Sequence, residues 1–450
     1  MAINLIVSAS TPNAAYSYLQ YVVTGSGPAE NYTNNQYKFI MDVYISGSTD
    51  KVARVTQPPN LNTGSVFNPA DIFQQYAFFD YVWDITGSLL STGSMKNYTL
   101  QFGEQYGTSP SSSLTVYPNL VSSSIAVIPA IDNSNDNYIG IKDFQLQLES
   151  EVLTNMPSNR NGTQTLVAND DWENIQYLTL DDYMTLSSLS TGSMGHSNIR
   201  VFDTDGNILS DEIYLLESGS DYRLHHLGCG PKNIIDKGGS GATAIQNPSA
   251  SYVNVIFDTY GTGQDVGYRL SPNYQNNQGD ILPGPGIIGS YGKPYQCGDY
   301  TRFAWINEYG VYDYYNVWSP IRKRTEINKE QLTESRINYW LGNTTNASVI
   351  SQNKKGRGTV DLYKQYKDIY QISTEYIPEV TANWIKFMFF SPSVFIQTDN
   401  GFLPIVITNS NYKVNTQQSA NKLFQYEIEF VYAKARRSKN YVGKLEYDQQ

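Results

Sequence analysis

Histidine, cysteine and charged residues, which carry most enzyme chemistry, are scarce in this sequence. The 450 residues include three histidines and two cysteines, and only 16% of them are Asp, Glu, Lys or Arg, against roughly 25% in a typical soluble protein. General acid–base and nucleophilic catalysis depend on these residue types. Their scarcity favours a structural or binding protein over an enzyme.

The sequence also has few of the features that mark secreted and membrane proteins. Cys229 and Cys297 are too few for a disulfide framework, so we expect two ordinary thiols, with a single bridge between them as the alternative. No stretch approaches the ~20 apolar residues that span a bilayer. Residues 1–10 lack the basic start and the apolar run of a secretory signal. We therefore expect a soluble chain that is made in a cytoplasm and has no membrane partner.

Basic residues are outnumbered by acidic ones, 31 to 42, for a net charge of −11. Affinity for a phosphate backbone comes from Lys and Arg that displace counterions, so we expect no direct nucleic-acid binding and attribute solubility to the acidity. The exception is a basic tail at residues 433–450. It either docks on an acidic neighbour or is a frayed terminus.

Tyrosine, in contrast, is abundant, with 37 residues. Its ring with a polar tip suits half-buried strands and protein–protein contacts, while the many Asn and Ser residues compete with helical hydrogen bonds. This composition predicts a mainly β protein. The tyrosines number 11 in residues 1–125, 12 in residues 126–300 and 14 in residues 301–450. This even spread argues against one sugar-stacking cleft and favours contacts over every domain.

Length and turn residues predict several domains, because 450 residues exceed one ordinary core. Short strands separated by Gly, Pro and Asn predict two antiparallel β-sandwich-like domains, at residues 1–125 and at residues 126–300, the second with long Gly- and Asn-rich loops. Residues 301–432 predict a C-terminal α+β module, a sheet covered by one helix. The basic tail follows.

Local patterns predict particular elements in the first two domains. We expect strands at residues 37–47 and 251–260, a short helix that opens at Asn68 and Pro69, and a hairpin around the Asp-Gly turn of residues 203–206. Stretches rich in Gly, Ser and Asn are expected to be turns, loops or linkers, and they are residues 91–94, 108–113, 121–124, 237–247 and 273–289.

The C-terminal module has the clearest patterns. A hairpin is predicted between strands at residues 301–306 and 311–318. Pro378 and Glu379 suit the first turn of a helix. The apolar stripe expected on that helix consists of Val380, Trp384, Phe387 and Met388. A final strand alternates, with one side formed by Phe424, Tyr426, Ile428, Phe430 and Tyr432.

Two clusters suggest metal ligands. His225 and His226 precede Cys229, but neighbouring strand residues point to opposite faces, so we expect strand residues and no metal site. Asp203, Asp205 and Asn207 have the spacing of a calcium loop. The glycine and the glutamate that such a loop needs are missing at its later positions, so a plain hairpin turn is expected.

Two further clusters suggest other chemistry. Residues 238–241 (GGSG) lack the lysine and the helix of a phosphate cradle and are expected to form a flexible loop. Carboxylates of the kind that cleave glycosidic bonds are expected to be solvated instead, and they are Asp170, Asp171, Glu173, Asp181 and Asp182. We predict no catalytic residue, no metal site, no cofactor and no enzyme activity.

Six aromatic-rich segments resemble one group of proteins. They are FAWINEYGVYDYYNVW (residues 303–318), PEVTANWIKFMFF (378–390), YEIEFVYA (426–433), INLIVSASTPNAAYSYLQYVV (3–23), YKFIMDVYI (37–45) and YRLHHLGCGPKNI (222–234). Together they resemble large Tyr- and Asn-rich, tail-associated virion structural proteins of tailed bacteriophages, especially phages of marine and other Bacteroidetes. The strand–helix–strand–strand ending also resembles the sheet-plus-helix domains of tail tubes and distal-tail rings.

The resemblance implies a non-enzymatic virion subunit of the tail, of its hub or baseplate, or of the head–tail connection. Such a subunit would be made in a bacterial host, form a homo-oligomeric ring and contact other virion proteins. A glycan-binding adhesin of the tail is the alternative, and a polysaccharide depolymerase is a third hypothesis. The residues expected at interfaces are Phe303, Trp305, Tyr312, Tyr314, Trp318, Trp384, Phe387, Tyr426, Phe430, Tyr432, Arg436 and Arg437.

Overall fold

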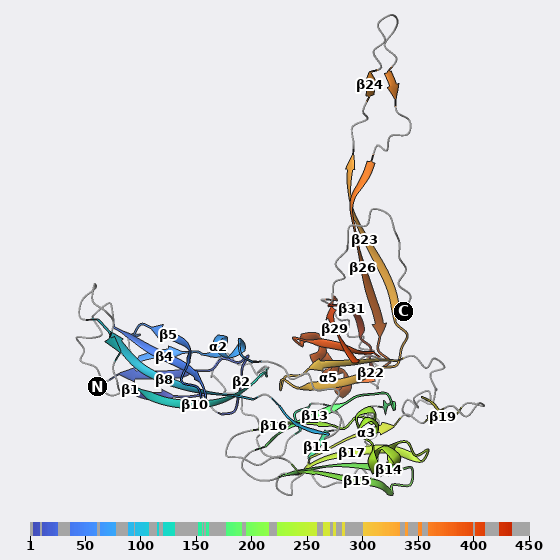
Figure 1. The fold of residues 1–450 in the computed structure, drawn as a ribbon, viewed down its shortest axis with the longest axis horizontal. Coiled ribbons are helices and arrows are strands. Elements are labelled where there is room, and N and C mark those ends of the chain that lie inside the picture. Colours follow the sequence, from blue (N-terminus) through green and yellow to red (C-terminus); the bar gives the residue numbers. More distant parts are fainter. Residues whose placement is uncertain are drawn as a thin grey trace, which may run out of the picture.

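The computed structural model is mainly β, as the composition predicts, with mostly antiparallel sheets and four short helices in the part that it describes (Figure 1). The described residues are 3–9, 11–25, 37–60, 64–77, 89–93, 95–107, 115–116, 120–130, 152–154, 156, 159–161, 177–190, 195–215, 223–258, 264–270, 273–275, 281–283, 300–333, 338–340, 350–352, 359–398, 401–409 and 423–433.

Two sheets form the N-terminal region. The first has the strand order β1 (Ile3–Val7), β3 (Tyr21–Gly25) and β6 (Gly64–Phe67). The second has the order β2 (Asn13–Ala14), β10 (Val121–Ile128), β8 (Lys96–Tyr106), β4 (Lys38–Ile45) and β5 (Lys51–Gln57), with β9 (Thr115–Val116) beside β8. Alternate apolar residues of both sheets meet in one buried cluster, which includes Tyr21, Phe39, Phe67 and Phe102. The short helix α2 (Ala70–Gln74) adds Phe73 to it.

The middle region contains two further sheets and two helices. One sheet has the order β11 (Asn159–Asn161), β18 (Gln264–Leu270), β17 (Ala250–Asp258), β14 (His196–Asp203) and β15 (Ile208–Leu215), with β12 (Tyr177–Leu178) beside β18. The other has the order β13 (Thr185–Ser190), β16 (Arg223–Gly228) and β7 (Leu90–Thr92). The helices α3 (Pro231–Lys237) and α4 (Gly239–Ile245) follow β16. Since β7 comes from the N-terminal third, this sheet ties the two regions together.

The C-terminal region is built on a seven-stranded sheet and one helix, α5 (Glu379–Phe390). The strand order is β22 (Tyr312–Val317), β21 (Thr301–Ile306), β28 (Val394–Thr398), β29 (Gly401–Ile407), β31 (Glu427–Tyr432), β26 (Thr359–Ser373) and β23 (Arg322–Thr333). Three two-stranded pairs complete the described fold, namely β19 (Asn273–Gln275) with β20 (Ile281–Pro283), β24 (Asn338–Trp340) with β25 (Ile350–Gln352), and β27 (Ile377–Pro378) with β30 (Leu423–Phe424).

One large buried cluster runs through the middle and C-terminal regions, from Leu89 to Phe430. A smaller cluster joins the N-terminal region to them, because Ala14, Ile128 and Ala130 pack with Val311 of the β21–β22 hairpin. The hairpin turn also approaches the backbone of Pro129 closely at Gly310. The three regions therefore contact one another through buried apolar side chains.

Several local predictions are confirmed. The predicted strand at residues 37–47 contains β4, the one at residues 251–260 overlaps β17, and α2 is the expected short helix. The hairpin of β14 and β15 turns at Gly206, whose φ is 83°. The β21–β22 hairpin and α5 also form where the pattern places them.

Three predicted turns or loops are wrong. Residues 121–124 belong to β10 because their backbone pairs with β8 in an unbroken ladder, and tertiary pairing of this kind overrides weak intrinsic preference. The predicted turn at residues 91–94 begins inside β7, which pairs with β16. The predicted loop at residues 237–247 contains α4, whose Ala242, Ala244 and Ile245 are buried.

One predicted loop is described only in part, and one predicted linker and the basic tail lie almost wholly outside the described residues. In the region of the predicted loop at residues 273–289, the described residues form the β19–β20 pair. The predicted linker at residues 108–113 and most of the basic tail, residues 434–450, lie outside the described residues.

The stripe predicted on α5 is displaced by part of a turn. Trp384 and Met388 are buried as expected, but Val380 is 56% exposed and Phe387 is only half-buried. The buried face instead consists of Thr381, Ala382, Trp384, Ile385 and Met388. This face points to the core because Trp384 packs on Trp305 of β21, with the ring centroids 5.2 Å apart.

Candidate functional site

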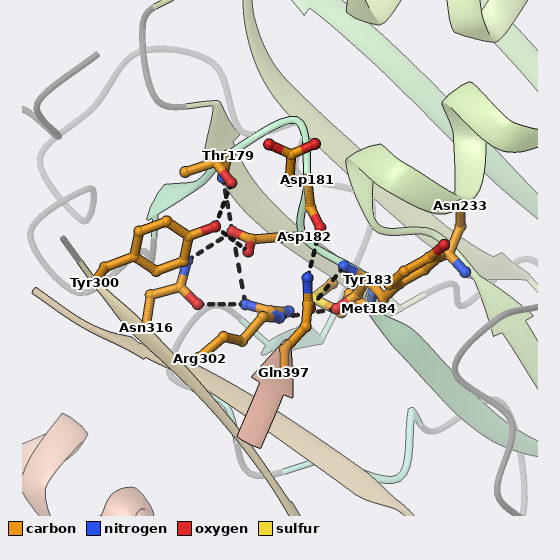
Figure 2. A network of polar contacts seen from close by, with 10 residues as sticks. All are labelled: Thr179, Asp181, Asp182, Tyr183, Met184, Asn233, Tyr300, Arg302, Asn316 and Gln397. Atoms are coloured by element: carbon orange, nitrogen blue, oxygen red, sulfur yellow. Dashed lines mark hydrogen bonds and ion pairs between the residues drawn. The ribbon is translucent and has the colours of Figure 1, made fainter. Parts of the chain in front are cut away.

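A network of buried polar side chains surrounds Asp182 and Arg302, where the segment before β13 meets the C-terminal sheet (Figure 2). Arg302 lies on β21 opposite Asn316 of β22. Its Nη1 donates to Oδ1 of Asn316 at 2.7 Å and lies 3.9 Å from Oδ2 of Asp182. Asn316 donates in turn to Oδ2 of Asp182 at 2.7 Å. The amide therefore bridges the two charges.

The carboxylate of Asp182 is placed by its own turn. Its Oδ2 accepts the backbone N–H of Thr179 at 2.7 Å, which closes the turn three residues earlier. Its Oδ1 accepts the hydroxyl hydrogen of Tyr300 at 2.8 Å. Burial raises the pKa of Tyr300, and the negative charge of Asp182 adds to that effect, so this hydroxyl stays protonated and acts as a donor. Each carboxylate oxygen thus has at least one hydrogen-bond donor.

Backbone groups complete the network. Nε of Arg302 donates to the carbonyl oxygen of Tyr183 at 2.9 Å. Gln397 of β28 donates to the carbonyl oxygen of Asp181 at 2.6 Å and accepts the N–H of Tyr183 at 3.1 Å. Oδ1 of Asn233 on α3 accepts the N–H of Met184. Side chains from three strands and one helix therefore bind the short segment of residues 181–184.

This network can hold segments together, because its charges face each other away from water. The side chain of Asp182 is fully buried and that of Arg302 is 1% exposed. The guanidinium also lies over the ring of Tyr314, 5.0 Å from its centroid. A buried charge without its partner is costly. The sequence-based prediction that Asp182 is solvated is therefore wrong, whereas Asp181 is exposed as expected.

A second buried carboxylate, Asp313 on β22, ties the hairpin to α5. It accepts hydrogen bonds from the hydroxyl of Thr154 and from Nε1 of Trp384, the latter at 2.8 Å. Burial raises the pKa of Asp313 to about 6, although the hydrogen bonds act in the opposite direction. The burial of Asp313 could not be predicted from the sequence, because a single aspartate in an aromatic strand is expected to face solvent.

The glycine-rich residues 238–241 begin a helix, contrary to the prediction of a flexible loop. Oε1 of Glu212 on β15 accepts the N–H of Gly241 at 2.9 Å, and Lys237 pairs with the same carboxylate. These contacts hold the pKa of Glu212 below its usual value although burial opposes them. A carboxylate of the chain itself therefore lies at the N-terminus of α4, where the helix dipole favours a negative charge.

The His225–Cys229 cluster is strand and turn, as predicted. His226 lies with Nδ1 at 2.8 Å from the hydroxyl oxygen of Ser187 on the neighbouring strand. Cys229 is a buried free thiol, and burial raises its pKa strongly, so it stays protonated. Within the described residues, no three His, Cys, Asp or Glu side chains are grouped to hold a metal ion. Cys297, Asp170, Asp171 and Glu173 lie outside those residues.

The loop of Asp203 is a hairpin turn, as predicted. Oδ1 of Asp203 accepts the N–H groups of Asp205 and Asn207, at 2.9 Å and 2.7 Å. The hydrogen bond from the side-chain amide of Asn207, together with these backbone bonds, lowers the pKa of Asp203. The carboxylate therefore stabilises the turn itself.

The predicted interface residues fall into three groups. Tyr432 is 37% exposed and Phe387 is half-buried. Arg436 and Arg437 lie outside the described residues. The other eight are buried in the chain itself, at 7% exposure or less, and they are Phe303, Trp305, Tyr312, Tyr314, Trp318, Trp384, Tyr426 and Phe430. Since these eight rings form the core of one subunit, they are not a surface for another.

The surface that the sequence prediction missed is the β23–β26 ribbon. It projects from the body as a long two-stranded arm (Figure 1). Every residue from Arg322 to Lys329 is exposed, so this part of β23 has solvent on both faces. The charged run RKRTEINKE (residues 322–330) lies in β23 and pairs with β26. No strand is predicted there, because a single apolar residue gives no alternation of apolar and polar positions.

No protein-family model matches the chain, and no curated protein matches it by sequence. Among the described helices, the longest is α5 with 12 residues, and none is long and apolar enough to cross a bilayer.

Proposed function

We propose that this chain is a non-enzymatic structural subunit of a tailed phage virion, in the tail, its hub or baseplate, or the head–tail connection. It assembles as a homo-oligomeric ring and contacts other virion proteins. In this proposal, residues 1–125 and 126–300 are β-sandwich-like domains, and residues 301–432 are the tail-tube-like module that forms the ring.

The observation that carries the proposal is the β23–β26 arm. An isolated two-stranded ribbon is marginal in water at best, and exposed strand edges invite pairing with another chain. The arm is an extension of a sheet whose other strands sit on a well-packed core. We therefore expect neighbouring subunits to cover the exposed ribbon in the assembled virion.

The polar networks support the same proposal. Asp182 and Asp313 accept hydrogen bonds from protein groups at the junctions of the regions, and Arg302 donates through Nε and Nη1. They rigidify the body, and a repeated assembly needs such rigidity because small errors in subunit geometry accumulate around a ring.

Native mass spectrometry of the purified full chain, alone and mixed with its neighbouring virion proteins, tests the proposal. We expect a single closed oligomer, and electron microscopy of that species should show a ring. A chain that stays monomeric in both samples contradicts the proposal. Specific binding of that monomer to a glycan array would favour the adhesin instead.

A further inference from the structure

Two buried carboxyl groups flank the contact between α5 and β22. Asp313 and Tyr315 are two residues apart on β22, so their side chains lie on the same face of the sheet. Nε1 of Trp384 on α5 donates to Oδ2 of Asp313 at 2.8 Å, and the ring of Trp384 packs edge-on against Tyr315, with the centroids 5.8 Å apart. The hydroxyl of Tyr315 donates to Oε1 of Glu375 at 2.6 Å. Both carboxyl groups therefore contribute to holding α5 on β22.

Glu375 holds the segment that leads from β26 into α5. Its Oε2 is buried and accepts no hydrogen bond from the chain. Burial raises the pKa of Glu375, although the hydroxyl of Tyr315 and the backbone N–H of Trp318 act in the opposite direction. A charged oxygen that is buried without a donor is costly. The surroundings of Glu375 therefore favour its neutral form.

No described cation compensates either carboxyl group. Asp313 and Glu375 form no ion pair with any described Lys, Arg or His. Arg302 of β21 lies on the opposite face of the sheet from Trp305, the residue that pairs with Asp313. The hairpin turn contributes Glu308, whose negative charge adds to the effect of burial and raises the pKa of Asp313 further. Both carboxyl groups thus lie in surroundings that disfavour a negative charge.

The other elements at this contact bring no compensating charge either. The charged residues of α5 are Glu379 and Lys386. Glu379 is exposed at the start of the helix, and Lys386 lies over the ring of Phe390, 6.0 Å from its centroid. Thr154, on the far side of Asp313 from α5, offers an uncharged hydroxyl. Tyr426 offers another, which donates to the carbonyl oxygen of Ala382 in α5 at 3.1 Å.

We propose that the α5–β22 contact is a pH-sensitive switch, which is tight when Asp313 and Glu375 are protonated and loosens when both ionise. Protonation keeps the hydrogen bonds of the contact, because Oδ1 of neutral Asp313 can donate to the hydroxyl of Thr154 while Oδ2 still accepts from Trp384. Ionisation places two negative charges in a buried contact without a cation. This switch goes beyond the proposed structural role and does not depend on it.

The direction of the switch follows from the two acids. The pKa of Asp313 is about 6 in the folded chain, and that of Glu375 is also raised. A group whose pKa is raised by folding stabilises the closed state at acidic pH, and this contribution is lost as the pH rises through the folded value. The helix should therefore open more readily at mildly alkaline pH than at mildly acidic pH.

Hydrogen exchange of the full wild-type chain tests the switch. Amide protection in residues 379–390 is compared at about pH 5.5 and about pH 8, after correction for the intrinsic exchange rate. We expect protection to fall by about fivefold or more at the higher pH. Amides of β4 and β8 in the N-terminal core should change much less. Constant protection in α5 overturns the proposal, and so does an equal fall in β4 and β8, because the whole chain would then respond.

Neutral variants assign the effect to the two acids. The double variant Asp313→Asn with Glu375→Gln keeps acceptors for Trp384 and Tyr315, and its protection in α5 should change by less than about twofold between the two pH values. Glu104→Gln is the matched control, because this buried carboxyl group also accepts a tyrosine hydroxyl, that of Tyr37, in the N-terminal region. It should keep the wild-type profile in α5. A double variant that keeps that profile also overturns the proposal.

Discussion

The two edge strands of the C-terminal sheet have opposite surroundings. All six residues of β22 are buried, and the contacts that cover them come from earlier parts of the chain, through Thr154 to Asp313 and through Asp182 to Asn316. β23, at the other edge, is exposed from Arg322 to Lys329. The same sheet therefore has one edge closed by its own chain and one edge open.

The two edges therefore have different consequences for stability and for association. Covering β22 requires buried polar side chains with matched partners, and those partners make the body rigid. β23 carries charges that water can solvate, so the isolated subunit can expose this strand to solvent. Changes at the closed edge should therefore alter stability, whereas changes at the open edge should alter association.

The largest expected difference is between Arg302→Met and Arg324→Met. Loss of the guanidinium of Arg302 leaves Asp182 buried without its cation, and we expect a loss of about 3–5 kcal/mol in the free energy of unfolding. The side chain of Arg324 on β23 is 59% exposed and pairs with exposed Glu326, so its replacement should cost about 0.5 kcal/mol or less. Denaturant unfolding of both variants measures the difference. Equal losses would mean that the closed edge is not held by its charges.

The next effect depends on pH and involves Asp313. Its pKa is about 6 in the folded chain, above the usual 3.8, so between these values the folded state holds a proton that the unfolded state has released. The free energy of unfolding should therefore fall as the pH rises through this window, by on the order of 3 kcal/mol from this group. Asp313→Asn should remove that part of the slope, because the amide does not titrate. Urea unfolding across the window tests this, and identical slopes for the two proteins would contradict it.

Gly310 tests the contact between the closed edge and the N-terminal region. Its φ is 78°, and a Cβ there would collide with the backbone of Pro129. Gly206 has a φ of 83° and open space around it. Both alanine variants should lose roughly 1 kcal/mol to the left-handed backbone, and Gly310→Ala should lose about 1–3 kcal/mol more to the collision. Thermal unfolding compares the two variants. Equal losses would show that the backbone around Pro129 shifts at little cost to make room for the new methyl group.

The smallest expected effect on stability is at the open edge itself. Ile327 is 58% exposed whereas Val317 of β22 is 1% exposed. Ile327→Thr should change the free energy of unfolding by less than about 0.5 kcal/mol, whereas Val317→Thr places a hydroxyl in the core and should cost about 1–3 kcal/mol. The same pair measured by sedimentation should show the reverse order for self-association. A large stability loss at Ile327 would mean that the arm is covered within the subunit.

Patterns in the sequence located elements whose signals are local. The Asp203–Gly206 turn forms because the aspartate accepts hydrogen bonds from the backbone N–H groups next to it, and the β21–β22 hairpin forms between two aromatic strands with a short connection, residues 307–311. Helix α4 was missed because its glycines disfavour a helix. It is held by Glu212, a residue from a different strand.

The site residues were harder to predict for a related reason. Aromatic residues suit cores and interfaces equally, so the composition at Phe303, Trp305 and Phe430 does not separate the two, and all three are fully buried. The network of Asp182 depends on partners more than 100 positions away along the chain. Spacing in the sequence carries no information about such pairs.

The sequence by itself determined the β-rich character, the acidic charge and the turns of the β14–β15 and β21–β22 hairpins, because these follow from residue preferences over a few positions. Only the tertiary structure decided which edge of the C-terminal sheet is closed and which side chains face solvent, because burial depends on what the rest of the chain places against a strand. Asp313 and Arg324 lie on edge strands of the same sheet. One is enclosed by Thr154 and Trp384, and the other extends into water.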